Sequence, residues 1–265
     1  MSDQKRAGYV ESRGTKIYYR RIGKGTPLIM LHGNGERHQI FKKQVEYLSK
    51  RYQVILVDSR GHGRSHVGNL EYTIELLAED VHHVTEALDL ERVILFGFSD
   101  GANAALQMAA CYPDEVLAVV AVSGNIQPKG LAPWFLFMVR MMYLGYWFLE
   151  KLYPPSWKQR QLFGLMAWYP QMTKTDLAKI QAPVLILTGS RDIVRPKHSI
   201  QMGDMIPHAQ VRIFKDSNHF SMFQRTEAYM KLTLRYLQSI GLSGESEKET
   251  EMKGITDYNQ TSALH

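Results

Sequence analysis

The sequence has very little cysteine, and this scarcity excludes two kinds of structure. Cys111 is the only cysteine among 265 residues, so the chain has neither an intrachain disulfide nor a cysteine-based zinc site. The first residues, MSDQKRAGYVESRG, contain no apolar segment typical of a signal peptide. A lone thiol and no export signal are typical of a cytoplasmic protein, which is the localisation that we expect.

The sequence also lacks a basic run and a clean membrane-spanning segment. Lys and Arg outnumber Asp and Glu by six, but they are scattered and not interleaved with stacking aromatic residues, so we expect no nucleic-acid partner. The most apolar stretch, 131–149, is interrupted by Pro133, Arg140 and Gly145. We therefore expect no stable membrane insertion. The sequence indicates no particular oligomeric state.

Short apolar runs alternate with helical patterns along most of the chain. The runs are apolar throughout, as in strands covered on both faces, and they span 28–31, 54–58, 92–98, 116–122, 183–189 and 211–214. The helical patterns include 74–88 with Thr73 as N-cap, 102–112, and a closing amphipathic helix over 222–240. Residues 8–23 predict an antiparallel hairpin. This order predicts an α/β fold around a mostly parallel sheet.

Two segments depart from this alternation. Residues 127–178 contain no strand pattern and are rich in Trp, Phe, Tyr and Met, so we expect a helical cap inserted between two strands of a core formed by 1–126 and 179–242. In the cap, Trp134, Phe137, Met141 and Trp168 are candidates for lining a substrate pocket, although helix packing explains them equally well. The polar tail, 243–265, lacks periodicity and is predicted to be disordered.

The stretch GFSDGA places Ser99 between Gly97 and Gly101. A strand pattern precedes it and a helix pattern follows it, which is the context that a nucleophilic serine on a sharp turn requires. Such a turn strains the backbone of the serine and leaves no room for side chains on either side. The alternative is a turn of small residues that serves only helix packing.

A nucleophilic serine needs a base, and the base needs a group that orients it. In a parallel sheet these groups come from loops at the carboxyl ends of strands. Asp192 and His219 follow the strands predicted at 183–189 and 211–214, in the order serine, acid, histidine. We therefore expect Ser99, His219 and Asp192 to act in series. Asp192 is alternatively a turn residue.

Other acids and histidines compete for these roles. Asp216 precedes the expected base by three residues and is predicted to shape its loop. His198 and His208, at the two ends of a helix, are interpreted as surface residues. His82 and His83 are neighbours on one helix, where only one of them can face a given site. We expect none of these residues to be catalytic.

Backbone N–H groups are expected to form an oxyanion hole. One is the N–H of Asp100, directly after the serine, and the other comes from the HGNG loop that follows the first predicted core strand. Asn34 is the expected donor there and Gly35 is the alternative, since Gly33 and Gly35 allow a close backbone approach. His32 is expected to brace this loop rather than to transfer a proton.

Five motifs together resemble those of the α/β-hydrolase superfamily. HGNG, DSRGHGRS, GFSDGA, GSRD and DSNH occur in the superfamily's order between about residues 8 and 240. The resemblance implies an eight-stranded, mostly parallel sheet, a cap domain, a Ser99–Asp192–His219 triad, no metal and no cofactor. The chain differs in one respect, because Ala102 follows Gly101 where many members have a second glycine, which is expected to narrow the turn slightly.

The resemblance implies a serine hydrolase of small carboxylic esters, since a serine at position 99 argues against dehalogenases and epoxide hydrolases, which use a carboxylate nucleophile. The open alternatives are a hydrolase of amides or C–C bonds, a haloperoxidase-like enzyme, a slow-turnover ligand-binding or signalling protein, and a membrane-associated lipase anchored by residues 134–148. Asp100 either favours the helix dipole or binds a cationic substrate group. The second role follows a weaker similarity to biphenyl-hydrolase-like enzymes, which cleave amino-acid esters.

Overall fold

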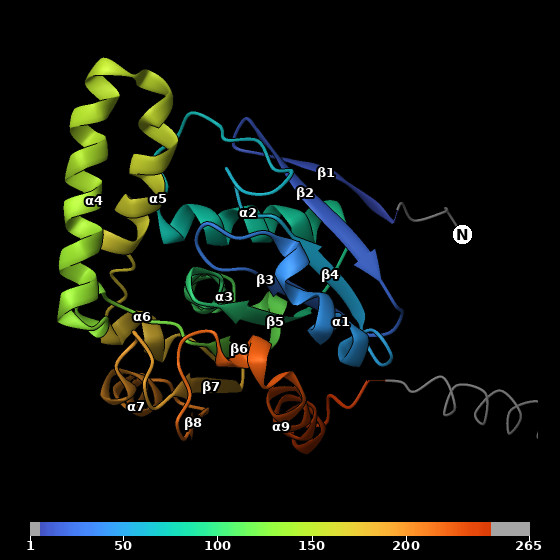
Figure 1. Ribbon diagram of the computed structural model, residues 1–265. Helices are drawn as coiled ribbons and strands as arrows, with labels where there is room; N and C mark the ends of the chain where they lie inside the picture. Colours follow the sequence, from blue (N-terminus) through green and yellow to red (C-terminus); the bar gives the residue numbers. More distant parts are fainter. Residues whose placement is uncertain (1–5, 245–265) are drawn as a thin grey trace, which may run out of the picture.

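The computed structural model describes residues 6–244, which form an eight-stranded sheet with helices on both faces (Figure 1). The strands are β1 (Ala7–Ser12), β2 (Thr15–Ile22), β3 (Pro27–Leu31), β4 (Gln53–Val57), β5 (Val93–Phe98), β6 (Val116–Val122), β7 (Val184–Gly189) and β8 (Ala209–Phe214). Their order in the sheet is β1-β2-β4-β3-β5-β6-β7-β8. The pairs β1–β2 and β2–β4 are antiparallel and the rest are parallel, which confirms the predicted fold class.

The central strands are apolar throughout because helices cover them on both sides. Every residue of β5 is buried, and so is every residue of β7. The prediction that 211–214 is covered on both faces is wrong, since the residues of β8 are all at least partly exposed. β8 forms the edge of the sheet, where it has a neighbouring strand on one side only.

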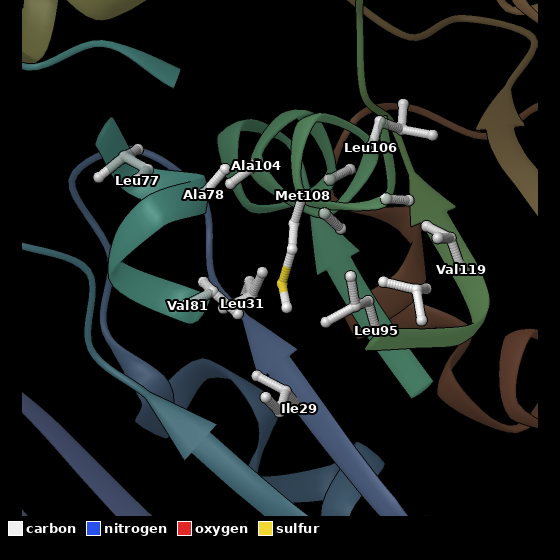
Figure 2. Close-up of a cluster of buried hydrophobic side chains, with 14 of the residues drawn as sticks. Ile29, Leu31, Leu77, Ala78, Val81, Leu95, Ala104, Leu106, Met108 and Val119 are labelled. Atoms are coloured by element: carbon white, nitrogen blue, oxygen red, sulfur yellow. The ribbon is translucent and has the colours of Figure 1, made fainter. Parts of the chain in front are cut away.

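Two sets of helices cover the sheet. The first set is α2 (Ile74–Ala87), α3 (Asp100–Cys111) and α7 (Pro196–Met205), and the second is α1 (Lys42–Leu48), α8 (Ser221–Gln224) and α9 (Thr226–Ser239). Figure 2 shows α2 and α3 beside β3 and β5, with Met108 of α3 pointing towards the sheet. The predicted cap of α2 is confirmed, because the Thr73 side chain accepts a hydrogen bond from the Leu76 N–H at 3.1 Å.

The closing helix predicted over 222–240 is interrupted. Arg225, with φ −115° and ψ 40°, separates α8 from α9. Its guanidinium donates to the Lys215 carbonyl at 3.1 Å and to Ser217 Oγ at 2.7 Å, in the loop that carries His219. Arg225 thus links the loop that carries His219 to the junction of α8 and α9.

The segment between β6 and β7 contains helices and loops but no strand. α4 (Pro133–Leu152) and α5 (Trp157–Trp168) form a hairpin at one side of the molecule, with α4 outermost (Figure 1). α6 (Lys174–Ala178) instead packs against α3 and α7 of the core. The single-turn 3-10 helices are η1 (His38–Phe41), η2 (Pro113–Glu115), η3 (Pro128–Gly130) and η4 (Pro154–Ser156).

Two further expectations concern the tail and the membrane. Except for residues 243 and 244, the tail predicted to be disordered lies outside the described residues. Within residues 6–244, no helix combines the length and apolar character needed to cross a bilayer.

Candidate active site

Ser99 lies on a strained turn between β5 and α3. Its backbone has φ +53° and ψ −122°, a conformation that side-chain-bearing residues rarely adopt. A Cβ at Gly97 would collide with the Gly101 carbonyl, and a Cβ at Gly101 would collide with the Leu31 carbonyl. The predicted requirement for glycine on both sides of the serine is thus confirmed.

Ala102 occupies the position where the resemblance leads one to expect a second glycine. Its methyl group faces Gly124, where an added Cβ would lie only 2.8 Å away. A glycine at 124 therefore leaves room for the alanine at 102.

The structure brings Ser99, His219 and Asp192 into one hydrogen-bonded series. His219 Nε2 lies 3.2 Å from Ser99 Oγ, and His219 Nδ1 lies 2.7 Å from Asp192 Oδ1. With its hydrogen on Nδ1, the imidazole donates to the carboxylate and accepts from the hydroxyl. Each residue follows a different parallel strand, β5, β8 and β7 respectively, so the sheet edge positions all three.

Asp192 is held by more than the histidine. Ser123 Oγ donates to Asp192 Oδ2 at 2.6 Å, and the Val194 N–H donates to Asp192 Oδ1 at 3.0 Å. Burial raises the pKa of the Asp192 carboxyl, but the hydrogen bonds from His219, Ser123 and Val194 outweigh it and hold that pKa below its usual range. Sequence reasoning missed Ser123, although its place directly after β6 could have indicated it.

The loop after β3 leaves one backbone donor free beside Ser99. The Gly35 N–H donates to His62 Nε2 at 3.0 Å and the Gly33 N–H donates to Glu36 Oε2 at 3.1 Å. Among residues 6–244, neither the Asn34 N–H nor the Asp100 N–H has a hydrogen-bond acceptor. Of the two donors considered in this loop, the geometry therefore favours Asn34 over Gly35.

Two buried histidines hold this loop. His32 Nδ1 donates to the Gly33 carbonyl at 2.8 Å, and His32 Nε2 accepts from the Ser59 N–H at 3.0 Å, which confirms the expected bracing role. Burial and the nearby His62 lower the pKa of His32 to about 3. Burial also lowers the pKa of His62. Both rings are therefore neutral near pH 7, as their acceptor roles require.

The Asn34 side chain connects the loop to α3 and to α5. Its Nδ2 donates to Asp100 Oδ2 and to the Leu162 carbonyl of α5, each at 2.9 Å. Asp100 Oδ1 accepts from Asn103 Nδ2 at 3.1 Å. Burial raises the pKa of Asp100, and the two amides and the nearby His219 only partly offset it. Asp100 is therefore a buried carboxyl group supported by amides.

A second carboxyl group, Glu36, lies at the same cavity. Burial raises its pKa from 4.5 to about 7, and the neighbouring Asp100 adds to the increase. The Gly33 N–H and His219 act in the opposite direction. Sequence reasoning missed Glu36, although it follows β3 closely and the loops after parallel strands carry the other site residues.

The cavity beside Ser99 has a volume of about 170 Å³ and a largely apolar wall. That wall comprises Phe98, Leu131, Phe135, Met166, Ile193 and Phe220. The four cap residues predicted to line it do not, among the described residues: Trp134, Phe137, Met141 and Trp168 are 64%, 66%, 45% and 40% exposed. α4 turns Phe135 and Val139 inward, so its residues Trp134, Phe137 and Met141 point elsewhere. Trp168 ends α5 and packs against Tyr143 of α4.

The alternative catalytic candidates His198, His208 and Asp216 are not part of the hydrogen-bonded series of Ser99, His219 and Asp192. The interpretation of His198 as a surface residue is wrong, because its ring is buried against Gly130 and its Nε2 accepts from the Ile126 N–H at 3.1 Å. Burial lowers the pKa of His198 to about 4. His208 is exposed, as expected, and Asp216 pairs with Arg191 at 2.8 Å.

The helix α2 carries the other two histidines away from the cavity. His82 stacks on Tyr112 and pairs with Glu115 at 2.8 Å, while His83 lies 2.8 Å from Ser12 Oγ. In the described part of the chain, no group of three or more His, Cys, Asp or Glu side chains is arranged to hold a metal ion.

Known proteins resemble this chain over most of its length. A family model described as the alpha/beta hydrolase fold matches residues 26–153. The AB hydrolase superfamily protein YisY of Bacillus subtilis (strain 168) is 27% identical over 262 residues, covering 84% of this chain and 96% of that protein. A pimeloyl-[acyl-carrier protein] methyl ester esterase of Aeromonas hydrophila is 26% identical, covering 80% and 95%.

A solved structure supports the same similarity. An N-acyl homoserine lactone degrading enzyme superposes with a TM-score of 0.70 at 26% identity, covering 85% of this chain and 98% of that one. The similarity thus extends over most of both chains.

Proposed function

Because the chain belongs to the α/β-hydrolase superfamily, we propose that it is a serine hydrolase that cleaves small carboxylic esters through an acyl-enzyme on Ser99. The observation that carries the proposal is the series of contacts from Asp192 through His219 to Ser99, at 2.7 Å and 3.2 Å. The free N–H groups of Asn34 and Asp100 next to this serine support it.

In the first half of the reaction, Ser99 Oγ attacks the ester carbonyl carbon and its proton passes to His219 Nε2. Asp192 stabilises the imidazolium that forms and keeps the ring oriented. The carbonyl oxygen becomes an oxyanion and accepts hydrogen bonds from the Asn34 and Asp100 N–H groups. The tetrahedral intermediate then collapses, His219 gives the proton to the leaving alkoxide, and the acyl group remains on Ser99.

In the second half, water replaces the alcohol. His219 Nε2 takes a proton from the water as its oxygen attacks the acyl carbon, and the same backbone donors stabilise the second oxyanion. Collapse releases the carboxylic acid, and the proton returns from His219 to Ser99 Oγ. The sum is one ester and one water converted to one acid and one alcohol.

The relatives and the cavity support an ester substrate of small size. Two of the similar proteins act, by name, on a methyl ester and on a lactone, which is a cyclic ester. The apolar wall formed by Phe98, Leu131 and Phe135 suits a hydrocarbon acyl group. The cavity volume of about 170 Å³ suits a short acyl group.

The carboxyl groups of Asp100 and Glu36 support a preference for esters that carry a free amine. Both line the cavity, and His219 is the one other titratable residue among its described lining residues. A protonated amine would favour the ionised carboxyl groups that burial disfavours. The competing role of Asp100 is to position Asn34, to which it is hydrogen-bonded.

A colorimetric ester assay tests the proposal. With p-nitrophenyl acetate, the wild type should show a burst and steady turnover, and Ser99→Ala should lose both by about a thousandfold or more. Ser239→Ala, at an exposed serine of α9, is the matched control and should retain full turnover. Tight ligand binding by the wild type with near-zero turnover would instead indicate a ligand-binding protein and reject the proposal.

A second assay tests the amine preference. The ratio of kcat/KM for an α-amino ester to that for its des-amino analogue should fall about tenfold or more in Asp100→Asn, since one charge interaction in a buried site is lost. If both rates fall equally, the ratio stays constant and Asp100 acts only by positioning Asn34. The same kcat/KM ratio measured in Glu36→Gln tests the contribution of the Glu36 carboxyl group.

A further inference from the structure

The outward side of α4 is a continuous apolar surface. Trp134, Phe137, Met138, Met141, Phe148 and Leu152 are all exposed, from 43% for Met138 to 86% for Leu152. Five of them recur at intervals of three, four or seven residues, so they lie along one side of the helix, and Phe137 adjoins them. We call these six residues the apolar face of α4.

The inward side of the same helix is already occupied. Tyr146 stacks on Phe163 of α5 with ring centroids 5.4 Å apart, and Tyr143 meets Trp168 edge-on at 5.8 Å. Val139 is the one buried residue of α4. Packing against α5 therefore explains the inward side, and nothing in the described part of the chain covers the apolar face. Contiguous apolar surfaces of this kind mark interaction sites.

Positive charge borders this surface. Exposed Lys129 precedes α4, and exposed Lys151 lies near its end with its Nζ 3.7 Å from the centroid of the Trp147 ring. The acidic Glu150 is paired with Arg160 of α5. Residues 127–178 contain six Lys or Arg and two Asp or Glu. Exposed lysines beside an apolar helix face suit a lipid headgroup region, because their flexible stems allow the amines to reach anionic headgroups.

We propose that the apolar face of α4 binds the surface of an anionic lipid bilayer, with the helix lying in the plane of the headgroups. Trp134, Phe137 and Phe148 enter the boundary between headgroups and acyl chains, and Lys129 and Lys151 contact the anionic headgroups. The protein then lies on the membrane without crossing it.

A second copy of the chain is a poorer occupant. A helix of 20 residues is roughly 30 Å long and about 10 Å wide, so two such faces would cover a footprint of about 300 Å² on each copy. Stable interfaces bury about 800 Å² on each partner. Repulsion between the lysines of two copies also opposes this pairing, whereas anionic lipid attracts them.

The apolar face of α4 is continuous with the cavity lining. The Trp134 ring meets the Phe135 ring edge-on at 5.6 Å, and Phe135 lines the cavity beside Ser99. Phe220, another lining residue, is 50% exposed. A bilayer on the apolar face would therefore lie next to the cavity.

Vesicle co-sedimentation tests this proposal. The wild type should bind phosphatidylcholine vesicles containing one part in four phosphatidylglycerol about tenfold more tightly than pure phosphatidylcholine vesicles, and salt should weaken the binding. The double variant Phe137→Glu/Phe148→Glu should lose about tenfold or more in affinity. Tyr9→Glu, at a tyrosine that is 51% exposed on β1, is the matched control and should bind like the wild type.

Three further measurements distinguish lipid binding from dimerisation and from misfolding of a variant. Lys129→Glu/Lys151→Glu, which leaves the apolar face intact, should lose the preference for anionic vesicles, and thermal unfolding should show that both double variants are folded. Ser99→Ala should bind vesicles like the wild type, whatever its effect on ester turnover. Failure of the wild type to bind anionic vesicles, unchanged binding by the phenylalanine variant, or a wild-type dimer that this variant converts to monomers without any vesicle binding would overturn the proposal.

Discussion

The helices α3 and α4 are both rich in apolar residues, yet they lie in opposite environments. In α3, residues 100–110 are all buried, whereas Val139 is the one buried residue of the longer α4. Five alanines of α3 allow it to pack closely on the sheet and on α2, while α4 presents Trp, Phe and Met side chains outward. Side-chain size, and not apolar content, distinguishes the helix that supports Ser99 from the helix that borders the cavity.

The largest expected effect concerns the chemistry at the sheet edge. Asp192→Asn should reduce ester turnover by about 10⁴-fold, or about 5.5 kcal/mol, because an amide no longer favours the imidazole tautomer with its hydrogen on Nδ1. Trp134→Ala on α4 should change turnover of a water-soluble ester by less than about threefold. Steady-state kinetics with p-nitrophenyl acetate measure both, and similar losses would mean that α4 contributes to the chemical step.

The next effect is on stability. Leu106 in α3 is fully buried, so Leu106→Ala should lower the free energy of unfolding by about 2–5 kcal/mol through lost burial and a residual cavity. Urea denaturation measures this change from the midpoint and slope of the transition. A loss of less than about 1 kcal/mol would show that α3 repacks and that its close fit adds little.

A pH effect is expected from Glu36, which lines the cavity beside Ser99. The unfolded chain releases the Glu36 proton near pH 4.5, whereas the folded protein keeps it until about pH 7. Glu36 therefore contributes stability that is present below pH 4.5 and is lost as the pH rises through 7. In Glu36→Gln this dependence should disappear, so the stability of the wild type relative to the variant should fall between pH 4.5 and pH 7.

Urea midpoints of the wild type and Glu36→Gln at several pH values across this window test the effect. If the midpoints of the two proteins changed with pH in parallel, Glu36 would not be the source of the pH effect. Glu75→Gln, in the first turn of α2, serves as a matched control. Its urea midpoint should change with pH in the same way as that of the wild type.

The smallest effect is expected from a Leu→Ala substitution on α4, which can be compared with Leu106→Ala on α3. Leu152 is 86% exposed, so Leu152→Ala should alter the free energy of unfolding in dilute buffer by less than about 0.5 kcal/mol. A loss comparable to that of Leu106→Ala would mean that the apolar face of α4 is covered in solution, for instance by a second copy. Size-exclusion chromatography with light scattering on the same samples would identify that copy.

The sheet and the three site residues could be predicted because their signals are local. Unbroken apolar runs indicated the buried strands, and glycines on both sides of Ser99 indicated the turn. Asp192 and His219 could be named because loops after parallel strands meet at one edge. The contact of 3.2 Å between His219 and Ser99 depends on the packing of β5 against the loop after β8, which no local pattern specifies.

The four candidate lining residues and His198 were mispredicted for a shared physical reason. α4 carries apolar side chains on every side, so periodicity could not show which side faces α5. Trp134, Phe137 and Met141 of α4 and Trp168 of α5 were assigned to a cavity that Phe135 and Met166 line instead. His198 is buried by Gly130, far away in sequence. In both cases burial is decided by a partner segment rather than by neighbours along the chain.

The side-chain amide of Asn34 has only two hydrogens, and both are engaged across different layers of the molecule. One is shared with Asp100 at the start of α3 and the other with the Leu162 carbonyl of α5. Any displacement of α5 away from the sheet must break the second of these bonds. The side chain of Asn34, whose backbone N–H lies beside Ser99, would then keep its bond to Asp100 alone.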